Sequence, residues 1–295
     1  MVSRLLYRDG LMLVLDKPAG MAVHQGPPNS RDRSRQCLQD FFDALRFGLP
    51  RAPSLAHRLD RDTSGCLILG RHRTALAQLG KLFKSGAIDK TYWAVVEGGP
   101  DAEEGEIVLP LGRLDVTRGW WMKHDPQGQT AVTKWRVMGS FSPPSCGEAR
   151  HPIARARRGP RLGVGVMRSG RTIDASHDPA TPLPTLPHKG GGKITWLSLE
   201  PLTGRTHQLR VHCAEMCWPI VGDAIYGNAS RQGGPVLHLH AREIVVPLYK
   251  NRPPIRVTAP VPSHMREQLM ICGWTGEEEY GEEHRHCERR EGIQS

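Results

Sequence analysis

The chain has 295 residues, of which 38% are hydrophobic and 24% charged, and its formal net charge is +10. This composition is typical of a globular protein with one large core or two small ones. It contains no apolar run near the ~18 residues of a membrane span. The seven cysteines show no framework spacing, so we expect free thiols in a reducing, cytoplasmic compartment. The positive charge fits an anionic partner such as nucleic acid.

Short strands and a few helices are predicted in alternation along the chain. The apolar residues 11–15 predict a buried strand that enters a turn at residues 16–20, where proline and glycine occur. Apolar side chains at helical spacing predict helices over residues 37–47 and 74–83. Further strands are predicted at 66–69, 92–96, 107–111, 130–137, 194–199 and 243–247. This pattern predicts an α+β fold on a mixed, largely antiparallel sheet with flanking helices.

Two segments depart from this pattern. Residues 142–193 hold eight prolines and eight glycines in 52 residues, which predicts a disordered insertion. The insertion carries nine Lys or Arg against three acids, so +6 of the net charge lies there. It either contacts nucleic-acid phosphates or is a tolerated surface loop without a role. Residues 263–295 are polar and acidic and predict a C-terminal tail.

Side chains capable of chemistry gather in three segments. Residues 57–65 read HRLDRDTSG, residues 90–92 read KTY, and residues 202–212 read LTGRTHQLRVH. The first segment places two arginines and two aspartates just before a predicted buried strand. Loops at strand ends are where functional sites tend to lie, but a salt-bridged surface turn has the same composition. Composition and spacing therefore leave a charged cluster without an assigned chemistry.

Two other kinds of site remain open at this point. Two histidines and two cysteines within residues 207–217 have spacings compatible with zinc. A second Cys/His cluster that would complete tetrahedral ligation is missing from the sequence, so we expect no bound metal. Asp60 and Asp62 are candidates for the carboxylate pair of a glycosidase, because residues two apart on a strand point the same way.

The same segments resemble the RluA family of RNA pseudouridine synthases. The family's motifs are matched, in its order, by residues 17–20 (KPAG), 57–65 (HRLDRDTSG), 90–92 (KTY), 203–212 (TGRTHQLRVH) and 219–227 (PIVGDAIYG). The resemblance covers residues 5–141 and 194–262, and it leaves out the insertion and the tail. It implies the pseudouridine synthase fold with a central RNA-binding cleft. It also places the catalytic domain in residues 1–262.

The resemblance implies a role for each of six side chains. They are Asp60, Tyr92 and Arg210 in catalysis, and Arg58, Arg205 and Leu202 in substrate binding. Asp60 would be the nucleophile, paired with Arg210. Arg58 would fill the gap left by the target base, because a planar guanidinium can stack there. Tyr92 would stack on the flipped uracil.

The implied reaction isomerises a specific uridine to pseudouridine in structured RNA, either ribosomal RNA, transfer RNA or both. The base must leave the RNA helix to expose its glycosidic bond, and an aspartate nucleophile splits one hard step into two. We expect no cofactor, since an isomerisation needs no redox or group donor. We also expect a monomer without membrane contact, in which His57 and Asp223 order loops. The alternatives are a catalytically inactive RNA-binding or remodelling protein with the same fold, and a hydrolase of free nucleosides.

Overall fold

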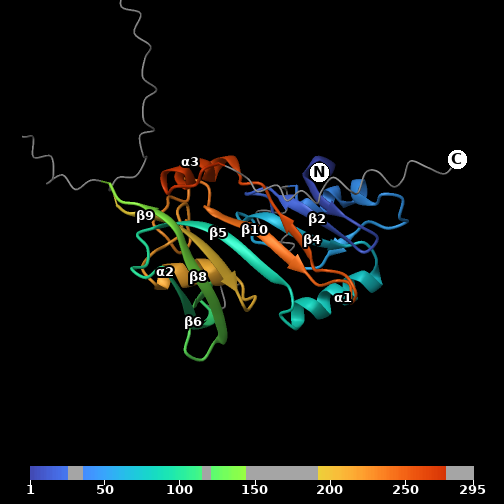
Figure 1. The fold of residues 1–295 in the computed structure, drawn as a ribbon, viewed down its shortest axis with the longest axis horizontal. Helices are drawn as coiled ribbons and strands as arrows, with labels where there is room; N and C mark the ends of the chain where they lie inside the picture. The colour runs from blue at the N-terminus through green and yellow to red at the C-terminus, as the bar shows by residue number, and fades with distance from the viewer. Residues whose placement is uncertain (26–35, 115–120, 144–191, 277–295) are drawn as a thin grey trace, which may run out of the picture. The chain divides into compact units, whose positions relative to one another are not determined.

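The computed structural model describes residues 1–25, 36–114, 121–143 and 192–276 (Figure 1). In these residues eleven strands form one sheet in the order β1-β2-β4-β10-β5-β9-β8-β6-β7, with β3 beside β4 and β11 beside β10. The strands are β1 (Leu5–Arg8), β2 (Met12–Lys17), β3 (Ser54–Leu55), β4 (Ser64–Gly70), β5 (Asp89–Glu97), β6 (Glu104–Arg113), β7 (Met122–His124), β8 (Gln129–Phe141), β9 (Ile194–Pro201), β10 (Leu239–Val246) and β11 (Ile255–Thr258). The helices are η1 (Val2–Arg4), η2 (Leu38–Leu45), α1 (Arg73–Lys84), α2 (Gln208–Glu215) and α3 (Ser263–Ile271). Strands β4 and β10 pair in parallel and the other pairs are antiparallel, so the predicted mixed, largely antiparallel sheet is confirmed.

Strand β10 lies between β4 and β5, although it follows both of them in the chain (Figure 1). Ala241 of β10 is opposite Gly65 of β4 on one side and opposite Tyr92 of β5 on the other. The loop that precedes β4 and the side chains of β5 are therefore brought close together by a strand that is distant in sequence.

Both faces of the sheet are covered around β2 and β4. Val14 and Ile68 belong to the core cluster that includes residues of α1, while Leu13 and Leu67 belong to the cluster that includes residues of η2. A strand covered on both faces reads as a continuous apolar run, which is why these two strands were predictable. The helix predicted over residues 37–47 is the 3₁₀ helix η2.

The sheet around β5 and β9 is also covered on both faces. Leu209 of α2 packs in one core cluster, and Met265 and Leu269 of α3 pack in another. Trp274, after α3, is buried in the same cluster as this helix. The boundary expected at residue 262 is therefore wrong, since the residues from 263 to 274 contribute to the core. The acidic end of the expected tail, residues 277–295, lies outside the described residues.

The predicted insertion joins two neighbouring strands. Phe141 of β8 pairs with Ile194 of β9, so the segment between them leaves and re-enters the sheet at adjacent positions. Residues 144–191 of it lie outside the described residues. The helices of the described part are too short or too polar to cross a membrane.

Candidate active site

All six side chains predicted for the site line one cleft of about 1070 Å³. They reach it from three places: the loop before β4, strand β5, and the segment from the end of β9 into α2. The residues are Arg58, Asp60, Tyr92, Leu202, Arg205 and Arg210. The fold thus brings together motifs that are up to about 150 positions apart in the chain.

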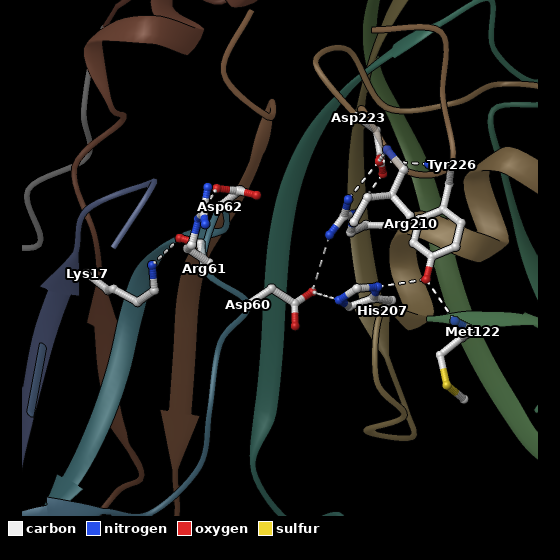
Figure 2. Close-up of polar contacts among 10 residues, drawn as sticks. Lys17, Asp60, Arg61, Asp62, Met122, His207, Arg210, Asp223 and Tyr226 are labelled. Atoms are coloured by element: carbon white, nitrogen blue, oxygen red, sulfur yellow. Dashed lines mark hydrogen bonds and ion pairs between the residues drawn. The ribbon is translucent and has the colours of Figure 1, made fainter. Parts of the chain in front are cut away.

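The loop that carries Asp60 is fixed by the buried side chain of Lys17. Its ammonium group donates to the carbonyl oxygens of Pro18 and Arg61, each at 2.8 Å. Figure 2 shows the contact with Arg61. Burial lowers the pKa of Lys17 to about 7, against the attraction of Asp62, Asp60 and Asp16. A buried ammonium group without hydrogen-bond acceptors would be costly. The two carbonyl contacts therefore explain why this lysine is tolerated inside the protein.

Glycine is required where the loop enters β4. Gly65 has a φ of +104°, and a Cβ atom there would collide with the backbone carbonyl of Ala241 on β10. The neighbouring Ser64 hydroxyl lies 2.9 Å from Nδ1 of His240 on β10. Strands β4 and β10 therefore approach closely beside the cleft, and the position of Asp60 is tied to that contact.

His57 orders the start of the same loop. Its Nε2 accepts a hydrogen bond from the Ile68 amide at 2.9 Å. Burial, together with the positive charge of Lys90, lowers the pKa of His57 to about 3. The imidazole is therefore neutral at physiological pH and can act as this acceptor.

The principal partner of Arg210 is Asp223. The guanidinium donates through Nε to Oδ2 at 2.8 Å and through Nη2 to Oδ1 at 2.7 Å, whereas its Nη1 lies 4.0 Å from Asp60 Oδ2 (Figure 2). Asp223 also accepts from the amides of Ile225 and Tyr226. The expected pairing of Arg210 with Asp60 is thus corrected to a long secondary contact, because the two planar groups of Arg210 and Asp223 match bidentately.

The buried charges of this pair stabilise each other. Burial alone would raise the pKa of Asp223, but the hydrogen bonds and charge of Arg210 hold it below its ordinary value. Burial would likewise lower the pKa of Arg210, and Asp223 raises it above its ordinary value. Both groups are therefore ionised, and Arg210 presents a fixed positive charge beside Asp60.

His207, one of the two histidines with a spacing compatible with zinc, also contacts Asp60. Its Nε2 lies 3.7 Å from Asp60 Oδ2, and its Nδ1 lies 2.7 Å from the Tyr226 hydroxyl (Figure 2). It lies directly before α2, three positions before Arg210, and its own backbone is left-handed rather than helical. Helical spacing along the chain therefore carried no signal for its place next to Asp60.

Tyr92 and Leu202 give the cleft its apolar surface. Tyr92 is half-buried on β5, and burial, with the negative charge of Asp60, raises the pKa of its hydroxyl. Its phenol is therefore neutral, and its ring can present a flat face in the cleft. Leu202 is 52% exposed and also lines the cleft.

Exposed cations line the cleft beside these groups. Arg58, Lys84 and Arg205 are all exposed and line it. The Arg205 amide donates to the Gln208 side chain at 3.0 Å, which fixes the backbone of this residue while its guanidinium reaches Thr130. A cleft with cations at its margin suits a polyanionic substrate.

The glycosidase and zinc alternatives lack the geometry that they need. Asp62 lies in a turn rather than on a strand, pairs with Arg61 at 3.4 Å, and is not among the described residues that line the cleft. In Figure 2 the carboxylates of Asp60 and Asp62 point to different neighbours. Within the described ranges, groups of three or more His, Cys, Asp or Glu side chains placed to hold a metal are absent.

Comparison with known proteins decides the family. The sequence model of the family described as RNA pseudouridylate synthase matches residues 11–215. The chain belongs to the RluA-type RNA pseudouridine synthases. It is therefore an isomerase that acts on RNA.

This synthase aligns with named relatives over most of their length. An uncharacterized RNA pseudouridine synthase of Zymomonas mobilis is 32% identical over 89% of this chain and 95% of its own. The ribosomal large subunit pseudouridine synthase C of Vibrio cholerae is 27% identical over 90% of this chain and 68% of its own. The solved structure of human RNA pseudouridylate synthase domain containing 4 superposes with a TM-score of 0.61 at 21% identity, covering 92% and 93% of the two chains. This last likeness confirms the pseudouridine synthase fold.

Proposed function

We propose that this synthase converts a specific uridine of structured ribosomal or transfer RNA to pseudouridine, with Asp60 as the nucleophile. The observation that supports the proposal most is the position of the Asp60 carboxylate. It lies in the cleft within 4.0 Å of Arg210 and 3.7 Å of His207, on a loop fixed by Lys17. A fixed guanidinium close to a carboxylate suits an aspartate that acts as a nucleophile.

The remaining side chains of the cleft fit the steps that the substrate requires. Extruding a base from an RNA helix costs a few kcal/mol. Arg58 is exposed and lines the cleft, and in this proposal its guanidinium occupies the space that the base leaves. Stacking of the flipped uracil on Tyr92 returns about 1–3 kcal/mol. Leu202 and Arg205 are exposed and line the cleft, and in this proposal they contact the neighbouring nucleotides.

The reaction itself conserves every atom of the substrate. The bond from uracil N1 to the sugar carbon C1′ breaks, a bond from C5 to C1′ forms, and a proton moves from C5 to N1. In this scheme the Asp60 carboxylate holds the substrate covalently between the two steps and leaves unchanged. The scheme therefore requires no redox cofactor or group donor, and we propose that a cytoplasmic monomer performs it.

The test is mass spectrometry for pseudouridine, after selective chemical tagging, on ribosomal and transfer RNA incubated with the protein. RNA incubated with wild-type protein should carry the chemical tag at one or a few sites. RNA incubated with Asp60→Ala should carry none, while the RNA affinity of this variant stays within about threefold of that of wild type. Asp62→Ala is the matched control, because it removes the same charge two positions away, outside the residues that line the cleft. Equal loss of tagging in both variants would contradict the assignment of Asp60. Tight RNA binding without any tagged site in the wild type would favour an inactive RNA-binding protein.

A further inference from the structure

His207 has a left-handed backbone conformation, which few non-glycine residues adopt. It precedes the first residue of α2 with φ 53° and ψ 16°, in the left-handed region, and its side chain is buried. Non-glycine residues in this region are uncommon, and such strain tends to persist where a side chain is needed at a defined place. The Nε2 atom of the buried imidazole faces Asp60, and the Nδ1 atom faces the Tyr226 hydroxyl.

Tyr226 is the hydrogen-bond partner of His207 Nδ1 and can fix which nitrogen of the imidazole carries the proton. The Tyr226 hydroxyl oxygen accepts from the Met122 amide of β7 at 2.9 Å and lies 2.7 Å from His207 Nδ1 (Figure 2). Burial raises the pKa of Tyr226 to about 12, so the hydroxyl keeps its proton. When that hydroxyl donates to Nδ1, a neutral imidazole must carry its own proton on Nε2, the atom that faces Asp60.

The imidazole is neutral under ordinary conditions. Burial lowers the pKa of His207, and the positive charges of Arg210 and Arg58 act in the same direction against the attraction of Asp60 and Asp223. His207 therefore presents Asp60 with a single N–H group rather than with a full positive charge. The positive charge at this carboxylate comes from Arg210.

Both contacts of the Asp60 carboxylate end on the same oxygen. His207 Nε2 and Arg210 Nη1 approach Oδ2, and Figure 2 shows the other carboxylate oxygen pointing away from both side chains. A carboxylate held through one oxygen presents the other in a fixed direction. The distance of 3.7 Å from His207 is longer than a hydrogen bond, and such contacts often shorten when a substrate closes the site.

We propose that His207 is a positioning residue, which holds Oδ2 of Asp60 through its Nε2–H group so that Oδ1 faces the target nucleotide. The inference rests on the proposed role of Asp60 as nucleophile. It adds a relay from the β7 backbone through Tyr226 and His207 to the reacting group. Displacement of a reacting atom by about 1 Å can cost on the order of 100-fold in rate, so this relay would act on turnover rather than on RNA affinity.

Two conservative variants separate the two ends of the imidazole. The amide nitrogen of His207→Gln reaches the position of Nε2 and keeps a donor for Asp60, whereas that of His207→Asn reaches only the position of Nδ1. We expect His207→Gln to keep single-turnover rates within about threefold, and His207→Asn to lose roughly 10–100-fold, with unchanged RNA Kd for both. Asn tolerates the left-handed backbone better than Gln. A purely structural role would therefore rank the two variants in the opposite order.

The second measurement does not depend on activity. Nitrogen-15 NMR of the imidazole should show His207 protonated on Nε2, and Tyr226→Phe should weaken that preference. Equal rates for His207→Asn and wild type, a larger loss for Gln than for Asn, or a proton on Nδ1 would overturn the proposal. If wild-type protein modifies none of the RNAs tested, the proposed function fails, and the NMR signal and its response to Asp60→Asn decide the His207 contact by themselves.

Discussion

The buried ion pair between Arg210 and Asp223 allows a quantitative test of how the site is held. Their side chains are 4% and 1% exposed, and the guanidinium meets the carboxylate through two hydrogen bonds of 2.8 and 2.7 Å. The perturbation is a double-mutant cycle with Arg210→Met, Asp223→Asn and the combined variant. Each single change leaves one charged group buried without its partner, and the double change removes both charges.

The size of the effect follows from the distance between the two groups. At 2.7 Å and an effective dielectric constant near 20, the attraction is about 6 kcal/mol. Desolvation of both ions offsets part of it, and removing one partner of a buried pair costs about 3–5 kcal/mol. We therefore expect each single variant to lose about 3–5 kcal/mol of unfolding free energy. The double variant should be no less stable than either single variant, which gives a coupling energy of at least ~3 kcal/mol.

Urea unfolding followed by circular dichroism measures these free energies from the midpoints and slopes. The control is the same cycle on Arg136 and Glu104, whose side chains are 68% and 70% exposed. In this pair Arg136 Nε lies 3.4 Å from Glu104 Oε2. An exposed pair of this kind should give a coupling energy of about 0–1 kcal/mol. A coupling energy for Arg210 and Asp223 as small as that of the control would refute the reasoning. It would mean that water reaches the pair, or that Arg210 relaxes onto Asp60 without loss.

Three further predictions concern the backbone, the pH dependence and the salt dependence. Gly65→Ala should lower the unfolding free energy by about 2 kcal/mol or more, because its Cβ would meet the Ala241 carbonyl at positive φ. The control is Gly80→Ala in α1, which has open space for a Cβ atom and should be neutral or stabilising. Equal denaturation midpoints for the two variants would contradict the close approach of β4 and β10. The pKa of Lys17 is about 7 in the folded protein against 10.5 in the unfolded chain, so the unfolded state binds more protons between these values and wild-type stability falls as pH drops through that range. In a series of denaturation experiments, the unfolding free energy of Lys17→Met should therefore rise relative to that of wild type by about 1.4 kcal/mol for each unit by which the pH drops from 10 to 7. A free-energy difference independent of pH would show that the ammonium is not desolvated. Arg205→Ala should reduce the slope of log RNA affinity against log salt by about 0.7–0.9, and an unchanged slope would place its guanidinium away from phosphate.

Strands and helices with a clear periodicity were predictable from the sequence. Strands β2 and β4 read as apolar runs because helices cover both of their faces, and α1 shows one apolar face. Helix α2 gives no such signal, because residues 208–213 are all buried, polar and apolar side chains alike, and the helix has no solvent-exposed face in that stretch. Helix α3 was assigned to the tail because the acidic residues after position 276 dominate the composition of that segment. Its buried Met265 and Leu269 are four positions apart, which is the helical spacing that indicated a core contact.

The residues of the site were predictable, but their pairing was not. The motifs identified six side chains, and the structure places all six around one cleft. Spacing along the chain does not show which way a guanidinium points. Asp60 was therefore expected as the main partner of Arg210, whereas the structure has Asp223 in that position. The contact of His207 with Asp60 likewise depends on a left-handed backbone at one residue, which a sequence pattern does not reveal.

The central position of β10 has a consequence for the order in which the site is made during synthesis. Asp60 and Tyr92 are translated early, but the strand that links their two parts of the sheet ends only at Val246. Contacts between residues so far apart in the chain form late in folding. A nascent or truncated chain that ends before β10 would therefore contain both side chains without the strand that joins them. The enzyme would become able to act on RNA only after β10 has been synthesised.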